Sequence, residues 1–107
     1  MPSKRPIGLA FGALPAKKLV TGTTTLKAWE RHVECTPHTS TTYTVTLPPC
    51  EEVPECFFYI LGGTGATGDV TIASAAGATV GTLTATADHM LLYSTGYAWV
   101  AVLDVTT

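Results

Sequence analysis

Apolar and polar residues alternate over several short stretches of the chain, and each alternation predicts a β-strand. Thr41–Leu47 has an apolar residue at every second position, which is typical of a strand with one buried face. Two prolines follow it and predict its end, because proline cannot donate to a β-ladder. Asp69–Ser74 shows the same alternation, and Thr79–Thr86 is a further candidate strand in which Gly81 indicates a bulge.

Two other stretches are apolar on both faces of the expected strand. Cys56–Leu61 is apolar throughout, so we expect a strand that is buried on both faces. His89–Tyr93 and Tyr97–Leu103 are separated by Ser94–Gly96, whose length and glycine predict a hairpin loop. Because both faces of Tyr97–Leu103 are largely apolar, we expect this strand to lie in the centre of a sheet and not at its edge.

The segment Thr23–Cys35 fits two patterns. Leu26, Trp29 and Val33 share one face of a helix, whereas the threonines and the later alternation fit a strand. We favour the strand, and a helix is the alternative.

These segments together predict an all-β fold. They amount to about seven short strands at intervals of roughly 8–12 residues, without a convincing helix. We expect residues 19–107 to form a small β-sandwich or a partly open barrel of antiparallel strands. The expected core consists of large side chains from these strands: Trp29, Tyr43, Val45, Phe57, Tyr59, Ile72, Leu91 and Trp99.

Residues 1–18 differ in composition and predict an extended N-terminal arm. Pro and Gly recur in this segment, and apolar residues alternate at Ile7, Leu9 and Phe11, which suits an extended chain that lies on another surface. A disordered tail is the alternative. Our candidate contacts with a sister subunit or a larger assembly are the basic and apolar residues of the arm: Lys4, Arg5, Ile7, Leu9, Phe11, Lys17 and Lys18.

Composition and charge argue against nucleic-acid binding and against insertion in a membrane. The chain has 107 residues, enough for one core, and only 13% of them are charged. All lysines and arginines lie in the first 31 residues, and seven of the eight acids follow them. This basic head is too weakly charged, and too poor in aromatic residues, to predict nucleic-acid binding. No apolar run is long enough to cross a membrane and the start does not resemble a signal peptide, so we expect a product made in the cytoplasm.

The cysteines and one histidine could form a zinc site, but their spacing along the chain does not favour it. Cys35, His38, Cys50 and Cys56 are four residues that could ligate zinc, but five residues separate the last two, a looser spacing than in zinc ribbons. Three cysteines is an odd count, and we expect free thiols and no cofactor. A single Cys50–Cys56 or Cys35–Cys50 bridge is the alternative.

A hydrolase site can also be drawn from the sequence. Cys50 or Cys56 could act with His89 and with Asp88 or Asp104, yet no strained turn presents a nucleophile. The loop Gly62–Gly68 is rich in glycine, but no Gly-Lys-Ser/Thr follows it to bind phosphate. We therefore expect a protein that is not an enzyme.

Four segments together resemble small β-domains of tailed-bacteriophage virions. They are Thr42–Pro48, Phe57–Ile60, Val70–Ile72 and Leu91–Trp99, so the likeness covers about residues 41–103. The chain is most similar to capsid decoration (cement) proteins. This resemblance implies a non-enzymatic structural protein on the capsid surface of the virion, bound to the major capsid protein and assembled as a homo-oligomer, a trimer or a dimer.

A carbohydrate-binding module of a fibre tip or virion surface is the alternative function. Exposed Tyr93, Tyr97 and Trp99 could stack on a sugar, although the position of Trp99 within a strand favours a core role and hence the decoration protein.

Overall fold

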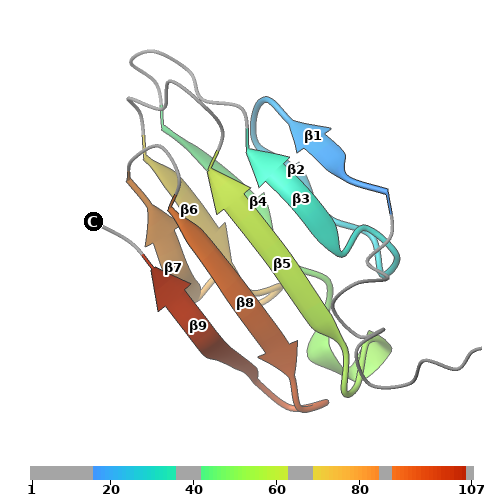
Figure 1. Cartoon of the computed structure of the whole chain (residues 1–107). Helices are drawn as coiled ribbons and strands as arrows, with labels where there is room; N and C mark the ends of the chain where they lie inside the picture. The colour runs from blue at the N-terminus through green and yellow to red at the C-terminus, as the bar shows by residue number, and fades with distance from the viewer. Residues whose placement is uncertain (1–15, 36–41, 63–68, 85–87, 106–107) are drawn as a thin grey trace, which may run out of the picture.

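The alternating stretches fold as the strands of two packed β-sheets (Figure 1). A computed structural model describes residues 16–35, 42–62, 69–84 and 88–105. The five-stranded sheet contains, in spatial order, β1 (Lys18–Val20), β3 (His32–Cys35), β5 (Phe57–Gly62), β8 (His89–Ser94) and β9 (Trp99–Val105). The four-stranded sheet contains β2 (Thr24–Thr25), β4 (Tyr43–Thr46), β6 (Val70–Ala73) and β7 (Thr79–Leu83), and a 3-10 turn, η1, covers Cys50–Glu52. The predicted all-β sandwich is confirmed.

The first six strands alternate between the two sheets, and this alternation sets their direction. β1, β3 and β5 are neighbours in one sheet, and β2, β4 and β6 are neighbours in the other. Between two neighbouring strands of one sheet, the chain therefore passes through a strand of the other sheet. This crossover lets the two neighbours run in parallel. The β5–β8, β6–β7 and β8–β9 pairs are antiparallel. The prediction of antiparallel strands throughout is thus wrong for the first half of the chain.

The core lies between the sheets and consists of every second residue of the paired strands. It includes Val33, Phe58, Ile60, Met90 and Leu92 from the five-stranded sheet, and Tyr43, Val45, Val70, Ile72 and Leu83 from the four-stranded sheet. The predicted core positions of Tyr43, Val45 and Ile72 are confirmed. Trp99 is partly buried and packs against this core, with its ring edge-on to Phe58 at a centroid distance of 5.2 Å.

Three residues predicted for the core lie on the opposite side of the sheet. Phe57, Tyr59 and Leu91 point away from the core, because in β5 and β8 the buried positions are the alternate residues Phe58, Ile60, Met90 and Leu92. A sheet that is covered on one side buries one face of each strand. The prediction that Cys56–Leu61 is buried on both faces is therefore wrong.

The last strand, β9, is an edge strand, and the prediction of a central strand is wrong. It pairs with β8 on one side, and in the described chain no strand lies on its other side. Tyr97 belongs to the turn before β9, where Thr95 accepts hydrogen bonds at Oγ1 from the Tyr97 and Ala98 amides. Gly96 has φ +95°, a conformation that favours glycine. The hairpin is confirmed, with a connection, Thr95–Ala98, that is one residue longer than expected.

Thr23–Cys35 forms two short strands, β2 and β3, that are separated by a turn. The Glu30 amide donates to the Lys27 carbonyl at 3.0 Å, and the Lys27 amide donates to the Glu30 carboxylate at 2.8 Å. Trp29 lies in this turn with 67% of its surface exposed, so its predicted core position is wrong.

The bulge predicted near Gly81 is present. Ile72 pairs with Gly81 and Ala73 pairs with Thr79, which leaves Val80 as the extra residue of β7. Gly81 also leaves room for Met90 in the core, because a Cβ atom there would lie 2.5 Å from Met90 Cε and 2.7 Å from Sδ.

Candidate binding surfaces

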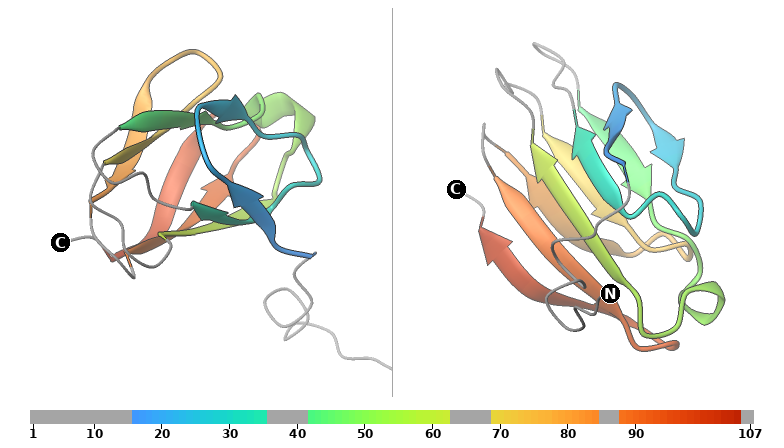
Figure 2. Two further views of the ribbon diagram at one scale, coloured as in Figure 1. Left: turned by 90° about the horizontal axis from the view of Figure 1, so that it is seen from above. Right: turned by 45° about the vertical axis from the view of Figure 1, so that its right-hand side comes forward.

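The side of the five-stranded sheet that faces away from the core is apolar, and we call it the outer face. Its side chains form three rows across the paired strands. The rows are Phe57, Tyr93 and Val100; His32, Tyr59, Leu91 and Leu103; and Leu19, Glu34, Leu61, His89 and Val105. Figure 2 shows the four-stranded sheet on one side of this sheet and no described strand on the other.

Aromatic side chains contact one another across the outer face. The rings of Phe57 and Tyr93 are 4.9 Å apart between centroids, and those of Tyr59 and His32 are 5.8 Å apart. His89 lies on the other side of Tyr59, at 6.2 Å. The rings therefore support one another along the sheet, and the outer face presents a continuous aromatic and aliphatic surface.

Charge is nearly absent from the outer face. Glu34 is the one acidic residue in its three rows, and the Glu34 carboxylate pairs with Lys17 Nζ at 2.5 Å. The most exposed apolar residues of the outer face are Leu19 in β1, which is 61% exposed, and Val100, Leu103 and Val105 in β9, which are 43–45% exposed. An apolar surface of this extent is typical of a protein interface.

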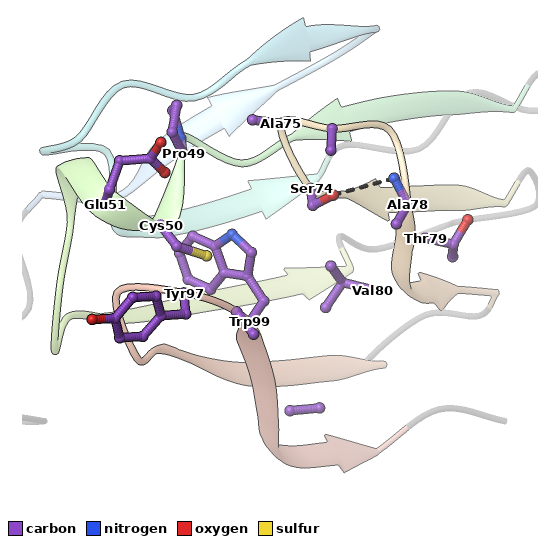
Figure 3. A pocket seen from close by; sticks show the side chains of 13 residues that line it. Pro49, Cys50, Glu51, Ser74, Ala75, Ala78, Thr79, Val80, Tyr97 and Trp99 are labelled. Atoms are coloured by element: carbon purple, nitrogen blue, oxygen red, sulfur yellow. Dashed lines mark hydrogen bonds between the residues drawn. The ribbon is translucent and has the colours of Figure 1, made fainter.

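A groove of about 690 Å³ opens between β7 and β9, on the side of the sandwich where each sheet ends. We call it the β7–β9 groove. Its lining residues are Pro49, Cys50, Glu51, Ser74, Ala75, Ala76, Ala78, Thr79, Val80, Tyr97, Ala98, Trp99 and Ala101. Figure 3 shows the Trp99 indole between Cys50 and the Ser74–Ala78 turn, with Tyr97 at one end. Most of the lining side chains are small.

A buried serine positions one wall of the groove. Ser94, at the end of β8, donates its hydroxyl to the Cys50 carbonyl at 3.1 Å, and its amide donates to the Cys56 carbonyl at 3.0 Å. The Glu55 amide in turn donates to the Ser94 carbonyl at 2.7 Å. These bonds hold the acidic loop Cys50–Glu55 against the β8–β9 hairpin, and they place Glu51 at the groove.

Trp99 leaves one polar group unsatisfied in the groove wall. Its Nε1–H is buried and has no acceptor among the described residues. A buried donor without a partner costs free energy, so this group destabilises the fold.

The predicted contact residues of the arm divide into two groups. Lys4, Arg5, Ile7, Leu9 and Phe11 lie outside the described residues. Lys17 and Lys18 lie at the start of β1, where Lys17 pairs with Glu34 and Lys18 Nζ lies 3.0 Å from a Glu30 carboxylate oxygen. Both lysines therefore contact acids of their own chain.

The three cysteines are separate free thiols in this structure. Among the described residues, no three His, Cys, Asp or Glu side chains gather where they could hold a metal ion. His38, the fourth candidate ligand, lies outside the described residues. Burial raises the pKa of Cys35 to about 12, against the effect of a hydrogen bond with Tyr43 that lowers it. Cys35 is thus a neutral core side chain, and the Tyr43 hydroxyl beside it donates to the Val20 carbonyl at 3.2 Å.

The structure does not bring the candidate hydrolase residues together. Cys50 and Cys56 hydrogen-bond through their carbonyls to the last residue of β8, whereas His89 begins that strand, about 17 Å away along an extended backbone. Asp88 is buried and accepts hydrogen bonds from the Thr84 amide at 2.9 Å and hydroxyl at 3.1 Å, so its carboxylate joins the end of β7 to the start of β8. Of the glycine-rich loop, residues 63–68 lie outside the described chain.

The three aromatic residues considered for sugar binding lie on two surfaces. Tyr97 is 95% exposed and lines the β7–β9 groove with Trp99. Tyr93 lies on the outer face against Phe57. Two of the three residues therefore share a site.

Sequence reasoning missed both surfaces, although each had a signal. The signal for the outer face is the presence of strands that are apolar at every position, and the signal for the groove is the set of small residues on either side of a tryptophan.

No helix in the described part of the chain is long and apolar enough to cross a membrane. Comparisons of the chain with protein-family models, curated proteins and solved structures find no match.

Proposed function

We propose that this protein is a non-enzymatic structural protein of a virion, which binds the surface of a phage capsid and reinforces it. The observation that supports this proposal is the outer face of the five-stranded sheet. A single chain that buries one side of this sheet and leaves the other side aromatic and apolar is built to be covered by another protein.

The outer face can supply the binding energy that such attachment requires. Complete burial of one large apolar side chain contributes about 1.5–3 kcal/mol, and the half-buried residues of this face would contribute a fraction of that each. Its three rows contain nine aliphatic, phenylalanine or tyrosine side chains. Their summed contribution can exceed the cost of association, which is at least about 4 kcal/mol. The desolvation penalty of this face is limited to one ion pair, Lys17–Glu34, which can stay in solvent if it lies at the rim of the interface.

The sequence resemblance supplies the proposed partner. Decoration proteins of tailed phages imply the major capsid protein as the lattice, and a homo-oligomer as the attached unit. The arm provides the candidate contacts with the capsid or a sister subunit, and the outer face is a second, larger candidate.

Binding to capsids tests this function. Capsids of the virus that carries the gene, stripped of this protein, are mixed with the full chain and sedimented. We expect the wild-type protein to sediment with the capsids, and the double variant Tyr59→Thr, Leu91→Thr to lose at least tenfold in affinity. Threonine suits a strand, so the variant should remain folded.

The matched control is Trp29→Thr, which removes an exposed aromatic residue outside the outer face. It should bind as the wild type does. Absence of wild-type binding would contradict the capsid assignment, and equal binding by the double variant would exclude the outer face as the attachment surface.

Carbohydrate binding is the second candidate, because exposed Tyr97 lies beside Trp99 in a groove that also contains Glu51 and Thr79. An aromatic ring with nearby carboxylate and hydroxyl groups suits a sugar. A glycan array with the wild type and Tyr97→Ala tests it. Binding that Tyr97→Ala abolishes would support this candidate, and no binding by the wild type would exclude it for the glycans on the array.

A further inference from the structure

The four outer edges of the sandwich differ in how they are protected against pairing with another strand. β1 has three residues and is flanked by Lys17, β2 has two residues, and β7 is interrupted by the bulge at Val80. β9 also has a bulge, at Val102, and it carries one charged residue, Asp104. It is nevertheless the longest of the four edge strands, with seven residues of which the last six are exposed, and it contains no proline or lysine. A long exposed edge of this kind favours pairing with a further strand.

We infer that residues Ile7–Phe11 of a second copy of this chain add to β9 as an extra strand and place their large side chains in the β7–β9 groove. This arm exchange supplies the interface of the homo-oligomer. It does not rest on the capsid assignment, because it concerns contacts between copies of this chain alone.

The arm and the groove are complementary in size. Large apolar residues at Ile7, Leu9 and Phe11 alternate with Gly8 and Ala10, so a strand in this segment has one bulky face and one small face. The groove of about 690 Å³ is lined mainly by alanine, serine and threonine around Trp99. Bulky side chains can therefore fill space that the body of the protein leaves empty.

Charge orients the arm along β9. Lys4 and Arg5 directly precede the apolar run, and the acidic loop with Glu51 and Glu52 borders the groove at the end where β9 begins. If the two basic residues meet these acids, the arm runs in the same direction as β9. The added strand is then parallel to its neighbour, as β1, β3 and β5 are to one another.

The reach of the arm requires a second copy. Ala16 lies next to β1, at the opposite edge of the five-stranded sheet from β9. The two edges are four strand spacings apart, about 19 Å in a straight line through the sheet. Phe11 is five residues from Ala16, a span of at most about 18 Å, and the path must go around the sandwich. A chain therefore cannot place Phe11 in its own groove.

Disulfide crosslinking tests this exchange in the full chain without capsids. Cys50 and Cys56 are first replaced by serine, and the buried Cys35 is retained. One chain then carries Ala101→Cys at the groove, and a second chain of different mass carries a single cysteine at one position from residue 7 to residue 11. We expect mixed disulfides from Ile7→Cys, Leu9→Cys and Phe11→Cys at least fivefold faster than from Gly8→Cys and Ala10→Cys, because only alternate residues of a strand face the groove.

The control replaces Ala101→Cys by Thr25→Cys, an exposed position in β2 at the other side of the sandwich. It should give little mixed disulfide with any arm position. Equal crosslinking to both positions, or no alternation along the arm, would overturn the inference. So would a disulfide that forms only within one chain when Leu9→Cys and Ala101→Cys are combined.

The oligomeric state provides an independent measurement. The full chain should be a multimer by light scattering at micromolar concentration, and Ile7→Ser, Leu9→Ser, Phe11→Ser should be a folded monomer. Gly8→Ser, Ala10→Ser should remain a multimer, since these residues face away from the groove. A wild-type monomer, or a multimer that tolerates the three serines, would overturn the exchange while leaving the capsid test above unaffected.

Discussion

Two adjacent phenylalanines on β5 point to opposite sides of the sheet and provide the sharpest test of the structure. Phe58 is fully buried in the core, where Trp99 packs edge-on against it. Phe57 is half-buried on the outer face, where its ring lies 4.9 Å from that of Tyr93. Substitution of each by alanine removes the same group from the same strand, so the difference between the variants reports the environment alone.

The expected losses differ severalfold. Phe58→Ala should lower the free energy of unfolding by about 3–5 kcal/mol, because it leaves a cavity in a close-packed core. Phe57→Ala should lower it by about 1 kcal/mol, mainly through the lost ring contact with Tyr93. For a domain of this size, about 1 kcal/mol corresponds to roughly 4–8 °C in Tm, so Phe58→Ala should lower Tm by at least about 12 °C.

Urea denaturation followed by circular dichroism at one fixed protein concentration measures both losses, since association would otherwise shift the apparent stability. Capsid binding by Phe57→Ala should also fall at a temperature where this variant is fully folded. Equal losses of stability for the two variants would refute the assignment of faces. An unchanged capsid affinity for Phe57→Ala would refute the outer face as a docking surface.

Three further measurements test individual residues. Gly81→Ala should lower stability by about 1–3 kcal/mol, because the new methyl group displaces the buried Met90 side chain, and calorimetry with Met90→Ala should show that the two effects are not additive. Cys35 should resist alkylation of the native protein at pH 8 because burial raises its pKa to about 12, and comparable labelling of Cys35 and the two half-buried cysteines would contradict this. Burial acts to raise the pKa of Glu30, but the Lys27 amide and the Lys18 ammonium together lower it. The stabilising effect of the ionised Glu30 carboxylate is therefore present above its unfolded-state pKa and is lost as pH falls through its folded-state pKa. The difference in stability between wild type and Glu30→Gln should therefore vanish in acid, and a constant difference down to pH 3 would contradict the lowered pKa of Glu30.

Alternation predicted the strands whose outward residues are polar. β4 and β6 were located to within two residues, with Tyr43, Val45 and Ile72 in the core, because threonine marks their outward side. Pairing partners could not be predicted in the same way. The parallel pairs arise from a chain that passes between layers, and no local pattern in the sequence encodes which layer a strand joins.

Alternation failed where both faces of a strand are apolar. In β5 and β8 a shift of one residue exchanges the core residues for those of the outer face, and hydrophobicity does not choose between Phe57 and Phe58 or between Leu91 and Leu92. The choice comes from the register with neighbouring strands and from the single covering sheet. The position of Trp29 was missed for a related reason, since a turn that is closed by Glu30 leaves the indole outside both layers.

A strand that is apolar on both faces signals that two surfaces must be covered, but the sequence does not say whether the second cover belongs to the same chain. This protein has one core, and its four-stranded sheet covers one side of the five-stranded sheet. The apolar residues of β5, β8 and β9 that face the other side would be a liability in an isolated monomer, because exposed apolar surface favours nonspecific association. We propose that this surface, the long edge of β9 and the uncharged apolar run Ile7–Phe11 are all covered on assembly, so that contacts with neighbouring chains bury what one chain leaves exposed.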